Sequence, residues 1–141
     1  LHLTQDTHLM NKLISAAILA VALVDGAALA AEWSPVKIEG NTVREIDLGS
    51  VAKNGNLVMF IARHTFANPD EYKVSRNKVK YMLIHNRADC ASRSLAQLAT
   101  EAYDDKMLLL SKQQIPLPQD LVVTRDSIDA AMLDFICNSG K

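Results

Sequence analysis

Residues 126–137 carry apolar side chains at helical spacing, and the stretch ends in one of the chain's two cysteines. The apolar positions follow one another at i, i+3, i+4, i+7 and i+8, which predicts one apolar stripe of an α-helix. The stripe comprises Ile128, Ala131, Met132, Phe135 and Ile136, and Asp126, Asp129 and Asp134 fall on the other side. Asn138 and Gly140 then favour the end of the helix. A single short amphipathic helix must bury its stripe against another element, so we expect it to lie on a sheet.

Residues 10–30 have the order of a secretory signal peptide. A lysine precedes a long apolar run, and an Ala-x-Ala site follows the run. We expect cleavage between Ala30 and Ala31, and we interpret residues 1–9 as lying upstream of the native start. Such a protein would keep no stable membrane anchor once the signal is removed.

A transmembrane anchor and a buried core helix are the two alternatives for the same apolar run. A helix that spans a membrane needs about 20 apolar residues, and Asp25-Gly26 ends this run earlier. A core helix would carry polar residues along one face, and only Ser15 interrupts the run. The sequence therefore favours a signal peptide.

Residues 31–141 are enough for one small domain, and their charge is balanced. Residues 1–30 hold one of the 15 Lys and Arg residues and two of the 16 Asp and Glu residues, which leaves 14 of each sign. General binding to nucleic acid needs a basic face. We therefore do not expect a nucleic-acid partner.

Cys90 and Cys137 are expected to form a disulfide, because the compartments outside the inner membrane are oxidising. This bond would tie the predicted terminal helix to the preceding part of the chain.

The sequence between the leader and the helix has strand character interrupted by turn signals. The predicted strands are 32–38, 42–47, 57–66, 78–85, 95–103 and 106–111. Asn54-Gly55 is a strong hairpin signal, whereas residues 48–51 indicate a turn or one helical turn. Residues 95–103 could be helical from their composition, but we favour a strand. The prediction is an α+β domain: an antiparallel sheet of five or six strands with one C-terminal helix packed on one face and tied by a disulfide.

Three further expectations follow from this arrangement. Residues 68–77 form a polar loop, and 115–118, with two prolines, form the linker to the helix. Met82, Ile84 and Cys90 share strand parity, so we expect them on the face that receives the helix.

Several short motifs in this order resemble the surface-adhesin protein E family of Gram-negative bacteria. They are Trp33 at the start of the domain, Ile46-Asp47, the apolar 57–62 strand, Asp89-Cys90-Ala91-x-Arg93, Tyr103-Asp104 and the final helix with Cys137. The resemblance implies one domain over residues 31–141, a tendency to form homodimers and, for the named adhesin, binding to host extracellular-matrix and serum proteins.

The chain departs from the family pattern at two places. The adhesin is a lipoprotein, but no cysteine stands near Ala31, so a periplasmic or secreted protein is expected here. The usual glycine after the Tyr-Asp turn is replaced by Asp105-Lys106.

A run of basic residues is the candidate binding site: Lys73, Arg76, Lys78 and Lys80. It could attract an acidic partner, or it could be a solvated loop and strand edge, where lysine discourages edge pairing. A third interpretation is head-to-tail self-association with the acidic residues 101–134.

His64 and His85 lie on predicted strands, but no close His/Cys spacing indicates a metal site. The sequence shows no nucleophile with a partnered base, no phosphate loop and no paired carboxylates. We therefore expect no metal, cofactor or catalytic residue. The prediction is an exported, non-enzymatic binding module. The alternatives are a periplasmic enzyme inhibitor acting through residues 66–77 and an enzyme using His64 or His85.

Overall fold

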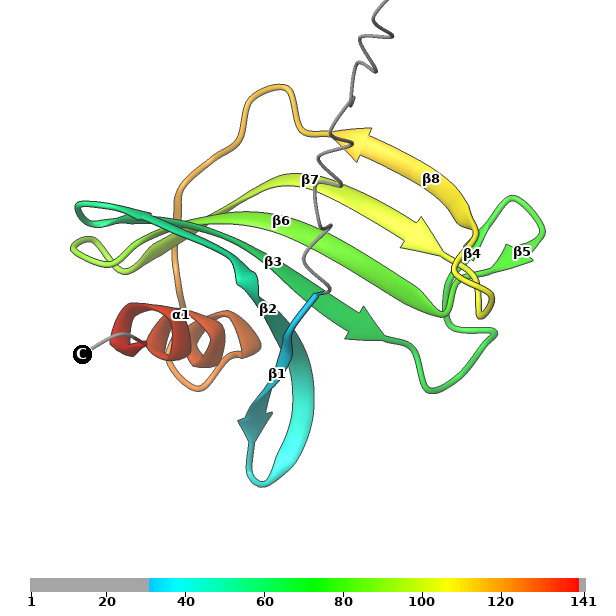
Figure 1. Cartoon of the computed structure of the whole chain (residues 1–141), viewed down its shortest axis with the longest axis horizontal. Helices are drawn as coiled ribbons and strands as arrows, with labels where there is room; N and C mark the ends of the chain where they lie inside the picture. Colours follow the sequence, from blue (N-terminus) through cyan, green and yellow to red (C-terminus); the bar gives the residue numbers. More distant parts are fainter. Residues whose placement is uncertain (1–30, 140–141) are drawn as a thin grey trace, which may run out of the picture.

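The computed structural model describes residues 31–139. The predicted leader, its cleavage site and the upstream segment 1–9 lie outside the described residues. Within them, an antiparallel sheet carries one C-terminal helix on one side (Figure 1). The elements are β1 (Trp33–Ile38), β2 (Asn41–Asn54), β3 (Leu57–Thr65), β4 (Lys73–Val74), β5 (Asn77–Lys78), β6 (Tyr81–Asp89), β7 (Ser94–Tyr103), β8 (Leu109–Gln114), β9 (Leu121–Val122) and α1 (Ile128–Asn138). The predicted fold class is confirmed.

Six strands follow one another across the sheet in the order β1-β2-β3-β6-β7-β8. The two-residue β9 adds to β7, and β4 and β5 form a separate two-stranded hairpin. The hairpin signalled by Asn54-Gly55 joins β2 to β3, and its two turn residues are Gly55 and Asn56, because Asn54 still pairs with Leu57. Gly55 has a φ of 60°, which glycine adopts without a steric cost. The segment 95–103 is a strand, because β6 pairs with it along nearly its whole length.

The predicted turn at 48–51 is wrong, because β2 continues through it as one strand with an irregularity in its pairing to β3. Polar side chains hold this bulge in place. The Asp47 carboxylate accepts hydrogen bonds from the backbone N–H groups of Gly49 and Glu32, at 3.0 and 2.9 Å. The Ser50 hydroxyl donates to the Asp47 carbonyl and accepts from the Ile61 N–H. Local polar residues therefore bend the strand here instead of ending it.

The main core lies between α1 and one face of the sheet. Its fully buried side chains come from every part of the fold: Val36, Ile46, Val58, Phe60, Ala62, Ala88, Leu95, Met132, Leu133 and Ile136. Cys90 packs against this cluster and is bonded to Cys137, with the two Cα atoms 5.7 Å apart. The predicted disulfide is confirmed.

A second, smaller core lies where the chain between β3 and β6 folds onto the sheet. It contains Phe66, Val79 and Ala102, and Met82 packs against it. Met82 is therefore not part of the surface that receives the helix, contrary to the prediction from strand parity. The strand is long enough for one end of the same face to be covered by α1 and the other by residues 66–79.

α1 begins at the N-cap residue Ser127, whose hydroxyl accepts a hydrogen bond from the Ala130 N–H at 3.0 Å. Asp126 precedes the cap at a φ of 60°, so only Asp129 lies in the first turn. Leu133, a residue outside the predicted stripe, is as fully buried as Ile136 within it. The buried face of the helix is thus wider than the five-residue stripe predicted from the spacing.

Replacing Ser127 with alanine should lower the free energy of unfolding by about 1 kcal/mol, because the Ala130 N–H loses its acceptor. Urea denaturation followed by circular dichroism measures the change. Ser127→Asp restores a capping acceptor and should recover most of the loss. Equal stability of the alanine variant and the wild type would contradict the capping role.

Candidate functional site

The sheet face opposite α1 is here called the open face. Along each strand, the side chains on this face alternate with those that point into the core. On the central strands, cross-strand neighbours on this face are Met59 and Arg87, Ile61 and His85, and Arg63 and Leu83. Towards the two sheet edges, Glu45 lies beside Arg63 and Lys112 beside Glu101. Two polar clusters result, and a cavity lies beside the second of them.

The first cluster is built around Arg63 on β3. Its guanidinium carbon lies 4.2 Å from the centre of the Trp33 ring and 5.6 Å from that of Tyr81. Its Nε and Nη2 atoms each donate to the same Glu45 carboxylate oxygen at 2.9 Å. The arginine is therefore held by a carboxylate and two aromatic rings, an arrangement in which the cation–π contacts also fix the ring positions.

The second cluster is built around Glu101 on β7, whose side chain is only 11% exposed. The Tyr103 hydroxyl donates to its Oε2 at 2.6 Å, and the Lys112 ammonium lies 2.9 Å from Oε1. These two hydrogen bonds lower the pKa of Glu101, the one from Tyr103 most, while the carboxylate raises the pKa of Tyr103 to about 12. Nε2 of His85 lies 3.5 Å from Oε1, which is too far for a good hydrogen bond, and it has no bonded partner.

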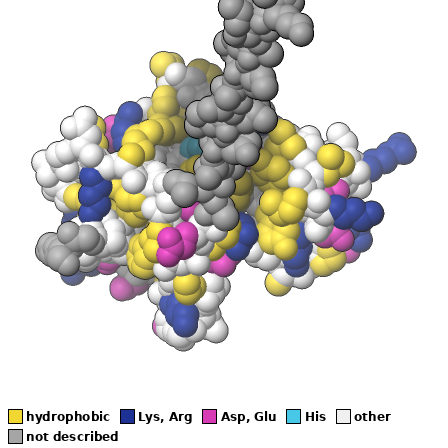
Figure 2. All heavy atoms as spheres, viewed as in Figure 1, with side chains coloured by type: hydrophobic (Ala, Val, Ile, Leu, Met, Phe, Trp, Pro, Cys, Tyr) yellow, Lys and Arg dark blue, Asp and Glu magenta, His cyan; other side chains and the backbone are white. Residues whose placement is uncertain are grey.

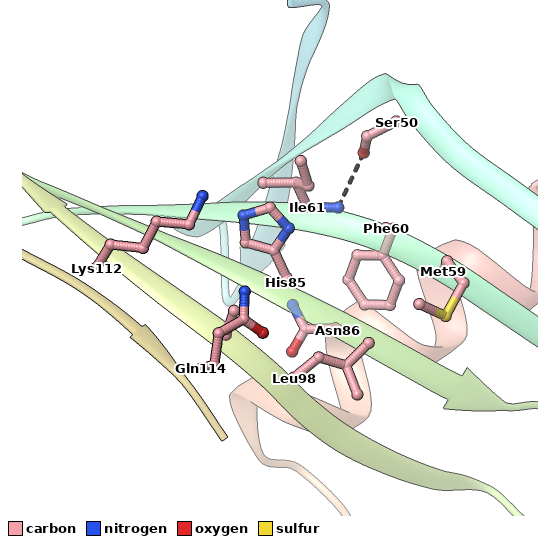
Figure 3. Close-up of a pocket in the computed structure, with 10 residues that line it drawn as sticks. Ser50, Met59, Phe60, Ile61, His85, Asn86, Leu98, Lys112 and Gln114 are labelled. Carbon is pink, nitrogen blue, oxygen red and sulfur yellow. Dashed lines mark hydrogen bonds between the residues drawn. The ribbon is translucent and has the colours of Figure 1, made fainter. Parts of the chain in front are cut away.

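A cavity of about 350 Å³ opens beside the second cluster, whose His85 and Lys112 line it. Figure 3 shows the side chains of His85 and Lys112 close together on one side of the ribbon, whereas Phe60 and Asn86 point the other way. Apolar atoms of Met59 and Ile61 line the same cavity. Met59 is 41% exposed and Leu57, farther along β3, is 42% exposed. The open face thus offers apolar, aromatic and ion-paired side chains around a shallow hollow.

The family model for surface-adhesin protein E matches residues 33–138, which is most of the chain. The chain belongs to the surface-adhesin protein E family. A family of surface adhesins implies an exported or surface-exposed protein. The match begins at Trp33 and includes Cys137, so it contains both polar clusters and the disulfide.

Solved structures of Haemophilus influenzae protein E have the same fold. Its crystal form II is 18% identical, with a TM-score of 0.57 over 73% of this chain and 86% of that one. The selenomethionine form is 17% identical, with a TM-score of 0.56 over 77% of this chain and 95% of that one. Protein E from a non-typeable strain gives 17% identity and a TM-score of 0.55 over 73% and 74%. No curated protein matches the sequence.

The candidate binding residues read from the sequence lie at the opposite end of this protein E-like domain from the disulfide, around the β4–β5 hairpin (Figure 1). Lys73 and Lys78 both contact Asp70, at 3.0 and 3.4 Å, and they lower its pKa. Lys80 donates to the Phe66 carbonyl. Arg76 is exposed at the turn. Figure 2 shows Lys and Arg side chains gathered at this end, with acidic atoms among them.

The two histidines of the strands face opposite sides of the sheet. His85 is on the open face, and His64 is on the side that carries the helix, next to Arg44. Nowhere in residues 31–139 do three or more His, Cys, Asp or Glu residues gather as they would around a metal ion. The part of the chain that the structure describes also holds no helix long and apolar enough to cross a membrane.

Replacing Glu101 with glutamine should return the pKa of Tyr103 from about 12 towards its ordinary value of 10.0, because the carboxylate both accepts the phenol hydrogen bond and repels the phenolate. A raised folded-state pKa means that this contact stabilises the fold fully below pH 10.0 and that its contribution is lost as the pH rises to about 12. Phenolate absorbance against pH measures the change, and Tyr103→Phe identifies the signal. An unchanged titration in Glu101→Gln would contradict the contact.

Proposed function

We propose that this domain is an exported, non-enzymatic module that binds a protein partner through its open face. The observation that supports this most is the contact of Arg63 with the Trp33 and Tyr81 rings on the sheet face that the helix does not cover. The half-exposed Met59 lies on the same face, farther along β3. Aromatic residues, methionine and arginine are enriched at protein interfaces. Tryptophan, tyrosine and arginine also supply much of the binding energy.

Family membership favours a host extracellular-matrix or serum protein, or another envelope protein, as the partner. In this proposal, the signal peptide is cleaved between Ala30 and Ala31. The mature domain, residues 31–141, then acts in the periplasm or outside the cell. A second copy of the same chain is a further partner, since members of this family tend to dimerise.

The β4–β5 hairpin has a separate role in this proposal. Lys73, Lys78 and Lys80 are held by contacts within the domain, whereas the exposed Arg76 pairs with no acid in residues 31–139. Charges at the rim of an interface mainly raise the association rate and make it depend on salt. Arg76→Glu should therefore slow association and weaken its salt dependence, with little effect on dissociation.

Retention of the purified domain on immobilised matrix and serum proteins tests the proposal. The wild type is compared with Met59→Asp, which places a charge in the centre of the open face. We expect at least about a tenfold loss of affinity, which corresponds to about 1.4 kcal/mol. Asp134→Asn, on the exposed side of α1, is the matched control and should bind like the wild type. Equal retention of Met59→Asp and the wild type would overturn the role of the open face.

Enzyme inhibition through residues 66–77 is the second candidate function. The observation in its favour is that this segment is held rigidly by the stacking of Tyr72 on Phe66, with ring centres 5.6 Å apart. An inhibitor would slow a lytic enzyme at a near-equimolar ratio. Arg76→Glu would abolish that effect, and Met59→Asp would leave it intact.

A further inference from the structure

Arg44 differs from the other five arginines because it is half-buried and no ion pair joins it to a carboxylate in residues 31–139. The others are either paired with an acid or exposed: Arg63, Arg87, Arg93, Arg76 and Arg125. Charged side chains that leave water are normally paired. Within the described residues, the half-buried Arg44 guanidinium therefore lacks the anionic partner that a buried charge normally has.

The hydrogen bonds of Arg44 leave its charge uncompensated. Nη1 donates to the Val43 carbonyl at 3.0 Å and to Nδ1 of His64, and both acceptors are neutral groups. Nε is shielded from water and has no hydrogen-bond partner among the described residues. Burial lowers the pKa of Arg44, and the charge of Asp129 opposes this shift. Burial, and then the charge of Arg44, lower the pKa of His64, against opposing effects of a hydrogen bond with the Val43 backbone and of the charge of Glu71.

Arg44 borders a pocket of about 280 Å³ at the point where β2 and β3 separate. Figure 1 shows the β1–β2 hairpin bending away from β3 there. His64 lines the pocket together with the hydroxyl-bearing Thr42 and Thr65, and Ile128 at the start of α1 contributes an apolar wall. Glu45 also lines it, but its carboxylate is already bound by Arg63. The pocket is therefore cationic, supplied with donors and large enough for a carboxylate on a short carbon chain.

We propose that this pocket binds a carboxylate group, with Arg44 as its counter-ion. A carboxylate is planar and carries one charge, which matches one guanidinium that makes paired N–H···O bonds. A phosphate dianion would need further cations, and the second basic side chain at the pocket, Arg63, is committed to Glu45. The carboxylate could belong to a peptide segment of a protein partner or to a small organic acid. Arg44 and His64 have the strand parity of the helix side of the sheet, whereas Glu45 and Arg63, at the border of the pocket, belong to the open face.

Side-chain NMR of the intact domain tests this site. The Nε–Hε signal of Arg44, assigned by its disappearance in Arg44→Lys, is followed while acetate or a blocked Gly-Glu-Gly peptide is added. We expect a saturable shift with both, and a raised pKa of His64 in the bound state, because the anion stabilises the imidazolium. Sodium chloride at equal ionic strength should give no saturation, and the Nε–Hε signal of Arg87 should stay in place.

The affinities of the two probes identify the source of the carboxylate. At least about tenfold tighter binding of the peptide indicates a polypeptide ligand, whereas equal or weaker binding indicates a free organic acid. Arg44→Lys keeps the charge but loses the paired donors, so the response of His64 to acetate should weaken at least about tenfold. A linear shift of the Arg44 signal, or one that chloride reproduces, overturns the proposal whether or not the variant folds.

Discussion

Replacing both Cys90 and Cys137 with alanine should lower the free energy of unfolding by about 4 kcal/mol. The bond closes a loop of 47 residues, and the loss of chain entropy in the unfolded state gives this figure for a loop of that length. A domain of this size has a total stability of about 5–15 kcal/mol. The bridge is thus a large part of the stability, and urea denaturation of the double variant measures its contribution.

Two comparisons separate the bridge from the packing of the cysteine side chains. The wild type unfolded in the presence of a reductant should match the double variant within about 1 kcal/mol, because both lack the same crosslink. The oxidised wild type should retain the α1 signal at urea concentrations where the variant has lost it. A difference in stability below about 1 kcal/mol between the oxidised wild type and the double variant would contradict the account of the helix as a crosslinked element.

Leu133→Ala should destabilise the domain by about 3 kcal/mol. Leu133 is fully buried between α1 and the sheet, so truncation removes apolar contacts and leaves a cavity that the bridged helix cannot close completely. The measurement is the urea midpoint with the disulfide intact. Asp134→Ala, one residue along on the exposed side, is the control and should cost less than about 1 kcal/mol, since it removes only a surface pair with Arg93. Equal effects of the two changes would contradict the observed orientation of α1.

The fold class could be predicted from the sequence because its strongest signals are short local motifs and the number of cysteines. The spacing of residues 128–136 indicates a helix wherever it docks, and two cysteines in an exported chain allow one pairing. The turns at 39–40 and 55–56 depend on glycine at positive φ, which short motifs reveal. These features set the class, the helix and the crosslink.

Other features depend on pairing partners that one sequence does not specify. The bulge after Asp47 requires the Ile61 N–H from the next strand to bond Ser50. β9 consists of Leu121 and Val122 and exists only because β7 offers a free edge beside β8. The helix covers only one end of β6, and Met82 lies at the other end. The path of residues 66–79, which cover that other end, cannot be read from the spacing of β6 alone.

The candidate site was missed for the same reason. Trp33, Arg63 and Tyr81 come from three strands, and only the register that sets Arg63 beside Glu45 brings them together. Alternation in β3 could have indicated an outward Met59 and Arg63, but not their neighbours. The basic run at 73–80 was visible in the sequence because its residues are adjacent, and yet Asp70, just outside it, neutralises part of its charge.

The methionine methyl groups report on each side of the domain separately. Met59 lies on the open face, Met132 in the main core under α1, Met82 in the second core, and Met107 at the exposed turn before β8. Carbon-labelled methionine therefore allows one NMR spectrum of the free and the partner-bound domain to compare all four regions.

The most direct test is that spectrum, recorded while a partner captured from matrix or serum proteins is added to the domain. We predict that the Met59 signal shifts or broadens first and that Met132 and Met82 stay in place. A Met59 signal that is unchanged at saturation, while Met107 or Met82 responds, would contradict binding through the open face.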